Sequence, residues 1–269
     1  MKKRLSLVSS FVLFCMCINA GVIHLFTKDC KYEAETVSDT EVRLNVPKCS
    51  SLYGSSHISI PSTVDLWYFR GAESKDISDP SYPGEPSWFY GTFTVVDVTF
   101  SGKENLQSVS LPSTMKESGY YMGCKNLNSI NLPSGVTIIE NNAFWGCESL
   151  KSVSFPSKLE SIRDGAFKGC VSLKSVSLSS CHSLKSIGYS AFSESGIKEI
   201  SFPSSLETIG DHAFLNCNSL EEVSYGLSSK LKEVGAGAFY QWGTKISYCG
   251  SKFFPFHYSL FTFFRIFAP

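Results

Sequence analysis

Residues 143–147 read AFWGC and residues 166–170 read AFKGC, and the pair Ala-Phe returns at 191–192, 213–214 and 238–239. When the chain is aligned on this pair, copies begin at residues 126, 149, 172, 196 and 219, and a copy two residues shorter begins at 105. A period of 23 or 24 residues in six copies is typical of a solenoid and lies in the range of leucine-rich repeats.

The repeat that contains AFKGC shows how one unit is built. In LKSVSF (150–155) apolar and polar residues alternate, which predicts a short strand. Pro156 ends that strand, because proline has no N–H to continue a ladder. Leu159 and Ile162 carry the chain round the outer side, and Phe167 returns to the interior. The recurring phrase therefore supplies each turn with its own core side chain.

One such repeat cannot bury its apolar side alone, whereas stacked repeats share a continuous interior. We therefore expect a leucine-rich repeat solenoid. It would be a right-handed coil with short parallel strands on a concave face and irregular or short helical segments on the convex face. Gly188 and Gly210 follow the outer apolar residue, but Glu140 and Arg163 fill the same place elsewhere, so no positive φ is expected there.

The whole pattern, L-x-x-V-x-F-P-x-x-L-x-x-I-x-x-x-A-F-x-x-C, resembles the BspA-like class of leucine-rich repeats over about residues 105–250. The resemblance implies a location at the surface of bacteria or parasitic protists. It also implies a binding role, because some members of the class bind host matrix proteins.

The ends of the chain suggest further divisions. MKKR, the apolar run LSLVSSFVLFCMCI and a small residue, Ala20, follow one another in the order of a secretory signal peptide; a buried strand or helix is the alternative. We expect residues 1–20 to be this signal peptide, 21–104 to be degenerate repeats forming an N-terminal cap, and 105–250 to be the solenoid. Within the cap, strand patterns recur at 42–49, 57–64 and 95–100, and residues 71–87 are expected to be an exposed loop, either for binding or a tolerated insertion.

Residues 251–269 form a phenylalanine-rich tail that is too short and too interrupted to span a bilayer. Packing over the last turn, lying at a membrane surface and being the product of a truncated reading frame all remain open for it.

Four cysteines lie three residues after the aromatic residue of their copy, and Ser195 takes that place in another copy. They are Cys124, Cys147, Cys170 and Cys217. Small buried thiols, disulfides between turns and a metal site are all open. No second ligand pair accompanies them, and parallel Cβ vectors strain a disulfide. Cys30 and Cys49, outside the repeats, are the better disulfide candidates.

Groups that could converge for catalysis are missing from the sequence pattern, so we expect no enzyme activity, no cofactor and no metal. Cys181 beside His182 is the one close Cys-His pair, and neighbours in an exposed loop seldom form a catalytic dyad. His182 and His212 are both expected to be solvated surface residues.

The strand residues that face outward form the candidate ligand-binding surface, on the expected concave face. It runs from neutral through basic to acidic along the stack. Its members are Asn128, Ser129, Asn131, Lys151, Ser152, Ser154, Lys174, Ser175, Ser177, Lys198, Glu199, Ser201, Glu221, Glu222 and Ser224.

These features predict a secreted or cell-surface protein that binds an extracellular protein or glycan, in adhesion to host or matrix macromolecules. Lys plus Arg and Asp plus Glu each number 24, so no net charge steers nucleic acid, and no transmembrane span is expected. The alternative is a structural, self-assembling surface protein without a specific ligand, associating through the C-terminal tail.

Overall fold

A computed structural model describes residues 22–26, 31–38, 41–45, 57–60, 62–69, 88–100, 102–225, 230–240 and 247–249. Within those ranges the only regular elements are β-strands. The expected signal peptide, the loop at 71–87 and the tail at 251–269 lie outside the described residues, and so do Cys30 and Cys49.

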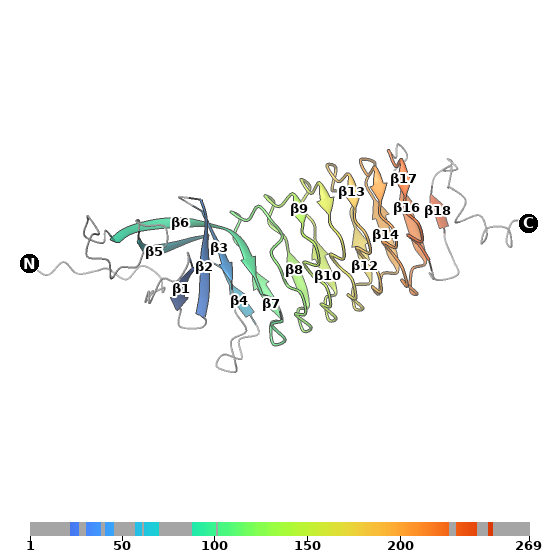
Figure 1. Ribbon diagram of the computed structural model, residues 1–269. Helices are drawn as coiled ribbons and strands as arrows, with labels where there is room; N and C mark the ends of the chain where they lie inside the picture. Colours follow the sequence, from blue (N-terminus) through green and yellow to red (C-terminus); the bar gives the residue numbers. More distant parts are fainter. Residues whose placement is uncertain are drawn as a thin grey trace, which may run out of the picture.

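Five strands at the N-terminal end form one mixed sheet, in the order β1-β2-β3-β6-β5 (Figure 1). They are β1 (Val22–Phe26), β2 (Lys31–Ser38), β3 (Glu41–Asn45), β5 (Thr63–Phe69) and β6 (Trp88–Thr99). Three of the neighbouring pairs are antiparallel, and only β3 and β6 run parallel. The strand patterns at 42–49 and 95–100 correspond to β3 and the end of β6, but nothing in the repeat predicts the antiparallel pairs.

The repeats themselves stack their main strands side by side along the solenoid (Figure 1). These strands are β4 (His57–Ser59), β7 (Ser108–Ser110), β8 (Ser129–Asn131), β10 (Ser152–Ser154), β12 (Ser175–Ser177), β14 (Glu199–Phe202), β16 (Glu222–Tyr225) and β18 (Ser247–Cys249). All their pairings are parallel and in register, as in Val153 with Ile130 and Val176 with Ile200. The strands form three hydrogen-bonded groups, β4-β7, β8-β10 and β12-β14-β16-β18, which lie next to one another, and we call the whole surface the first sheet. It confirms the predicted parallel-strand solenoid.

A second parallel sheet runs along the opposite side of each turn. Its strands are β9 (Ile138–Ile139), β11 (Ser161–Ile162), β13 (Ser186–Ile187), β15 (Thr208–Ile209) and β17 (Glu233–Val234). The sequence predicts irregular or short helical segments here. Each β-branched isoleucine instead buries its side chain and pairs with the next, which favours an extended backbone. Gly188 and Gly210 have no positive φ, as expected.

The recurring aromatic residues form one continuous column through the interior. Neighbouring rings are stacked with centroids 5.0 to 5.4 Å apart and planes inclined by 4 to 20°. The column consists of Phe100, Tyr121, Phe144, Phe167, Phe192, Phe214 and Phe239, all of them buried. Offset stacking at this separation is favourable for aromatic rings, so the predicted core role of the Ala-Phe pair is confirmed.

The corner that carries each ring is itself hydrogen-bonded from turn to turn. The amide of Phe167 donates to the carbonyl of Ala191 at 2.6 Å, and the amide of Gly169 donates to the carbonyl of Ser193 at 2.9 Å. Gly169 has a φ of 71°, in the left-handed region, and Glu194 takes the equivalent place in the next turn with a φ of 61°. A non-glycine residue there is strained.

The cysteines of the repeat are free thiols that bridge the turns by hydrogen bonds. The Sγ atom of Cys147 donates to the carbonyl of Tyr121 at 3.1 Å, and that of Cys170 to the carbonyl of Phe144 at 3.2 Å. Cys124 and Cys217 make the same contact, each at 3.1 Å. Of the three alternatives left open by the sequence, the structure has the buried thiol.

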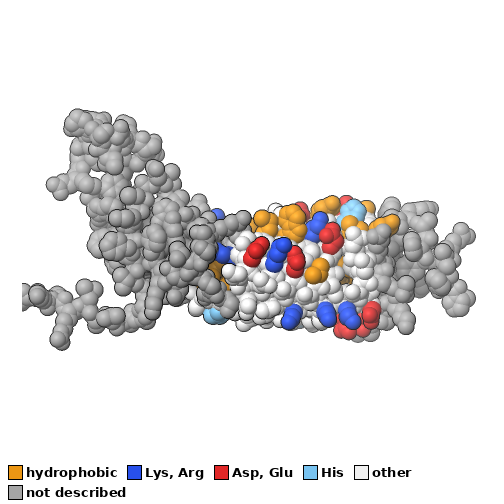
Figure 2. All heavy atoms as spheres, turned by 90° about the horizontal axis from the view of Figure 1, so that it is seen from below, with side chains coloured by type: hydrophobic (Ala, Val, Ile, Leu, Met, Phe, Trp, Pro, Cys, Tyr) orange, Lys and Arg blue, Asp and Glu red, His pale blue; other side chains and the backbone are white. Residues whose placement is uncertain are grey.

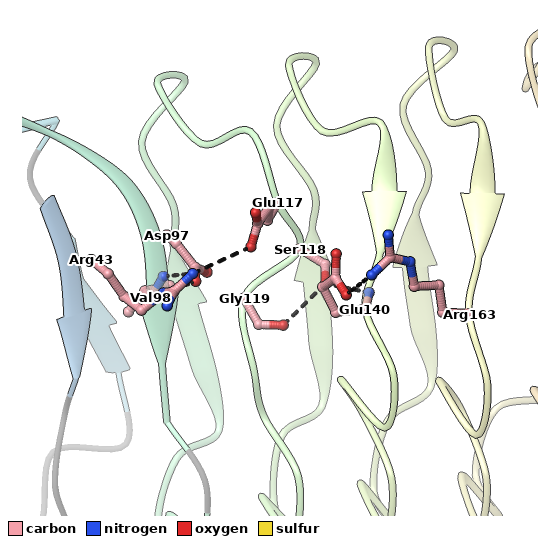
Figure 3. Close-up of polar contacts among 8 residues, drawn as sticks. All are labelled: Arg43, Asp97, Val98, Glu117, Ser118, Gly119, Glu140 and Arg163. Carbon is pink, nitrogen blue, oxygen red and sulfur yellow. Dashed lines mark hydrogen bonds and ion pairs between the residues drawn. The ribbon is translucent and has the colours of Figure 1, made fainter. Parts of the chain in front are cut away.

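Two separate groups of charged side chains lie at the N-terminal sheet and the first turns (Figure 3). Arg43 Nε, on β3, donates to Asp97 Oδ2 on β6 at 2.5 Å, and its guanidinium lies 3.8 Å from Glu117. One turn further on, Arg163 Nη1 lies 2.6 Å from Glu140 Oε2. Burial raises the pKa of the Asp97 carboxyl against the lowering effect of Arg43. Arg43 and Asp97 are partners on the neighbouring strands β3 and β6, so their pair lies within the N-terminal sheet, and the contact of Arg43 with Glu117 is the one that reaches the first repeats.

Candidate functional site

The candidate surface maps onto five successive strands of the first sheet: β8, β10, β12, β14 and β16. All fifteen residues lie in these strands or immediately before them. Their side chains are exposed except for those of Ser201 and Ser224, which are half-buried. The alternation predicted from the sequence is therefore present, with the intervening Val176 and Ile200 buried in the core. We call these fifteen residues the first-sheet face.

One row of this face carries its positive charge. The row consists of Asn128, Lys151, Lys174, Lys198 and Glu221, each directly before its strand. Backbone hydrogen bonds join most neighbours in the row: the amide of Lys151 donates to the carbonyl of Asn128 at 2.8 Å, and that of Lys198 to the carbonyl of Lys174 at 2.7 Å. Since paired parallel strands lie about 4.8 Å apart, Lys174 and Lys198 start from backbone positions about that far apart. Lys151 directly precedes β10, which contacts β12 without being hydrogen-bonded to it as a strand. Figure 2 shows a row of basic side chains followed by acidic ones along its lower edge.

These three lysines, which we call the lysine row, make no ion pair with any residue that the structure describes. Some other lysines of the solenoid are paired: Lys232 lies 2.6 Å from Glu207, and Lys125 lies 3.6 Å from Glu148. Lys158, Lys185 and Lys230 are exposed and, like the lysine row, make no ion pair with a described residue. What distinguishes the lysine row is its alignment, because two ammonium groups a few ångströms apart repel by up to about 1 kcal/mol in water.

Short hydroxyl side chains flank the lysine row. Ser152 and Ser175 follow Lys151 and Lys174 directly and are exposed. Toward the C-terminal end, the hydroxyl of Ser224 donates to that of Ser201 at 2.8 Å. Exposed carboxylates at Glu199, Glu221 and Glu222 then reverse the sign of the charge. The face therefore carries short polar side chains beside its lysines, and its charge changes from positive to negative along the solenoid axis.

The two residues of the Cys-His pair considered in the sequence differ in exposure. Cys181 was expected in an exposed loop, but its side chain is fully buried, because its amide donates to the carbonyl of Leu178 and folds the insertion inward. His182 beside it is exposed, as expected. Burial raises the pKa of the Cys181 thiol, which disfavours a nucleophilic thiolate.

The expectation for His212 was wrong. Its side chain is half-buried, its ring meets Tyr189 edge to face at 5.8 Å, and its Nδ1 is buried without a hydrogen-bond partner. It occupies the left-handed position at the start of its corner, with a φ of 56°. The corner directs the imidazole toward Tyr189 of the preceding turn. The residue type at this position varies between repeats, so the sequence could not indicate this contact.

No group of three His, Cys, Asp or Glu side chains suited to a metal ion occurs among the described residues. Within the same part of the chain, no helix is long and apolar enough to cross a membrane.

Sequence reasoning missed a second surface at the corner that follows each stacked ring. The large hydrophobic side chains that are exposed there or close by are 42 to 57% accessible: Met122, Trp145, Val171, Tyr189 and Tyr240. Ion pairs lie among them, since Lys125 pairs with Glu148 and Lys168 with Glu194 at 3.6 and 3.7 Å. The sequence did contain an indication of this surface. The variable residue x of A-F-x-G-C recurs once per repeat, so the residues at this position in successive repeats are neighbours in the stack.

Comparison with known proteins places this geometry in a family. A family model described as a BspA type leucine-rich repeat region matches in six copies, over residues 91–180 and 117–246, which is more than half of the chain. A search of curated proteins found no match.

Comparison with solved structures found further similarities. A leucine-rich repeat protein of T. pallidum is 24% identical, with a TM-score of 0.57, over 82% of this chain and 97% of that one. A leucine-rich repeat protein from Bacteroides ovatus is 20% identical, with a TM-score of 0.35, over 87% of this chain and 76% of that one. The pneumococcal vaccine antigen PcpA is 16% identical, with a TM-score of 0.44, over 90% of this chain and 71% of that one.

The first of these similarities shows the same fold, and the family model accounts for the repeat that builds both sheets. The chain is a repeat protein and belongs to the BspA-type leucine-rich repeat family.

Proposed function

We propose that this chain is a secreted or cell-surface protein that binds an extracellular protein or glycan, in adhesion to host or matrix macromolecules. Export is supported by the charged, apolar and small-residue order of residues 1–20. The binding surface in this proposal is the first-sheet face.

The unpaired lysine row is the observation that carries the proposal. Lys151, Lys174 and Lys198 are exposed, lie in one row and make no ion pair with a described residue, whereas Lys125, Lys168 and Lys232 elsewhere on the solenoid are paired. A partner with carboxylate, sulfate or phosphate groups along an extended chain would supply that counter-charge. The acidic residues Glu221 and Glu222 would repel the same partner, which fixes where it begins and how it is oriented.

The chemistry of the face favours a macromolecule over a small metabolite. Serine side chains beside the lysines offer hydrogen bonds without blocking the approach of a large partner. A row of side chains that crosses several parallel strands can contact an extended ligand along its length. Solenoid proteins commonly bind extended partners on their long faces in this way.

The first prediction is that the variant Lys151→Glu/Lys174→Glu/Lys198→Glu loses binding. The chain would be tested against matrix proteins, anionic and neutral glycans and whole cells, at low and high salt. Binding by the unaltered chain should fall at high salt, because screening shortens the reach of exposed charges. The variant should bind at least about tenfold more weakly, since each reversed lysine replaces an attraction by a repulsion.

The matched control changes three lysines away from this row: Lys158→Glu/Lys185→Glu/Lys230→Glu. All three are exposed, so net charge changes equally while the first-sheet face is untouched. The control should bind like the unaltered chain, and thermal unfolding should show that both variants are folded. Equal binding by all three proteins to every partner in the panel would refute the proposed site.

A further inference from the structure

The corner after each stacked ring carries charged and apolar side chains: the apolar residue comes first in the turns of Tyr121 and Phe144, and the charged residue comes first in the turn of Phe167. Seven of them lie on four consecutive turns, those built on Tyr121, Phe144, Phe167 and Phe192, and together we call them the corner ridge. Its members are Met122, Lys125, Trp145, Glu148, Lys168, Val171 and Glu194. Figure 2 shows basic and acidic side chains alternating in a row beside hydrophobic ones on this face.

The apolar part of the ridge is centred on Trp145. Its ring is 44% exposed, and the ammonium of Lys168 from the next turn lies 5.9 Å from the ring centroid. Met122 and Val171, on the turns before and after, are also exposed. Exposed tryptophan beside other apolar side chains is typical of surfaces that become buried in an interface.

The charges of the ridge are self-complementary. In turn order they are Lys125, Glu148, Lys168 and Glu194, which alternate from positive to negative. Rotation by 180° about an axis that passes between the second and third turns reverses the order of the turns. The first turn of one copy then faces the fourth of the other, and the second faces the third. Each such pair of turns joins a lysine to a glutamate.

From this order we propose that the corner ridge joins two copies of the chain in an antiparallel dimer with two-fold symmetry. Glu148 of one copy pairs with Lys168 of the other, and Lys125 pairs with Glu194, each contact occurring twice. Trp145 lies in the middle pair of turns, where the interface is most buried. A dimer with two-fold symmetry uses the same patch on both copies, so self-complementarity is its requirement.

The spacing of the turns supports a second copy as the occupant. Two copies of one solenoid have the same rise per turn, about 4.8 Å, so contacts that match at one turn stay in register over all four. A parallel arrangement would instead place each lysine opposite the same lysine. The charge order therefore selects the antiparallel orientation.

Glu194 adopts a φ of 61° at a place where Gly146 and Gly169 of the two preceding turns have a φ of 71° and Asn216 of the next turn has a φ of 58°. The corner therefore accepts a residue other than glycine at this place, although glycine is the less strained. The carboxylate of Glu194 already pairs with Lys168 of its own chain, and the proposed contact with Lys125 of a second copy adds to that pair.

The test is a charge exchange between the two residues of the central contact. In Glu148→Lys, two ammonium groups would meet at each central contact; in Lys168→Glu, two carboxylates would meet there. Each variant alone should self-associate at least about tenfold more weakly than the unaltered chain, because both central contacts become repulsive. An equal mixture of the two should form a heterodimer, in which both contacts are opposite in sign again.

Sedimentation of the full chain would measure the association, and native mass spectrometry would identify the heterodimer by mass. Lys185→Glu, an exposed lysine of the second sheet, is the control for net charge and should associate normally. Glu194→Gly should weaken the dimer while leaving thermal stability unchanged or higher.

Three outcomes would overturn the proposal: a monomeric unaltered chain, self-association that persists in both charge variants, or a mixture without heterodimer. Association through the C-terminal tail gives the second of these outcomes, because it does not depend on the ridge. The dimer does not rest on the lysine row, so failure here leaves the proposed adhesion untouched.

Discussion

At the corner of each turn, one aromatic ring and one thiol are buried for different physical reasons. The ring fills volume, and stacking it on the rings of the adjacent turns contributes about 0.5–1.5 kcal/mol beyond its burial. The thiol donates a second hydrogen bond to a backbone carbonyl of the preceding turn: the carbonyl of Phe144 accepts from the Sγ of Cys170 and from the amide of Cys147. In the one turn with Ser195, the hydroxyl lies 3.3 Å from the Sγ of Cys217. A small side chain with a weak donor is what this position requires.

The thiol of Cys124 predicts a loss of stability at alkaline pH. Burial raises its pKa from 9.0 to about 11 in the folded chain. Between those values the unfolded chain releases this proton and the folded chain keeps it, so the free energy of unfolding falls as pH rises from about 9 to about 11. Urea unfolding at pH 8, 9 and 10 would measure the fall. In Cys124→Ala the fall should be smaller, and an identical pH dependence in both proteins would contradict the assignment.

The recurrence of phenylalanine in each repeat was enough to predict the buried ring. The recurrence of cysteine gave three alternatives, and the buried thiol was one of them. Recurrence was not enough for Cys181 and His212. Both positions lie where the local backbone, a turn within an insertion and a left-handed corner, decides the direction of the side chain. A sequence period gives the position of a residue in its turn, but it does not give the backbone angles of an exceptional turn.

At the scale of one turn, the sequence predicted the main strand and its end but not the second strand. LKSVSF has enough residues to show alternation, and Pro156 marks where the strand stops. The second strand is only two residues long in each turn, as in Ser161–Ile162. Two residues cannot display a period, and the pairing that makes them a strand comes from the neighbouring turns.

Removing one ring from the middle of the column should destabilise the whole solenoid. Phe167→Ala is expected to lower the free energy of unfolding by about 3–5 kcal/mol, because the ring is fully buried between Phe144 and Phe192. Phe155→Ala is the matched control: that ring contacts Phe167 edge to face at 5.8 Å but is only half-buried. Its loss should cost clearly less. Equal losses, measured by chemical denaturation, would contradict the column as the main source of core stability.

At the scale of the whole molecule, the chain presents two long surfaces with different chemistry. The first-sheet face carries the unpaired lysine row, and the corner ridge carries paired charges around Trp145. The sequence predicted the first, because strand alternation identifies outward residues. It could not predict the second, since the ridge combines residues at different positions of successive repeats, and only the stacking of the corners brings them together.

The N-terminal sheet shows the same limit on a larger scale. Its antiparallel pairs depend on contacts between strands that have no repeat in common, such as β5 with β6. The pair of Arg43 with the buried Asp97 joins two neighbouring strands of this sheet, β3 and β6, and neither residue belongs to a repeated motif. Long-range pairs of this kind leave no local pattern in one sequence.

Lysine footprinting tests the proposed binding face most directly. The chain would be acetylated briefly with and without a partner identified in the panel, and the modification of each lysine would be read by mass spectrometry. We expect Lys151, Lys174 and Lys198 to be protected in the complex, while Lys158, Lys185 and Lys230 react as in the free chain. Protection of the second group, or unchanged reactivity of the lysine row in a saturated complex, would contradict binding through the first-sheet face.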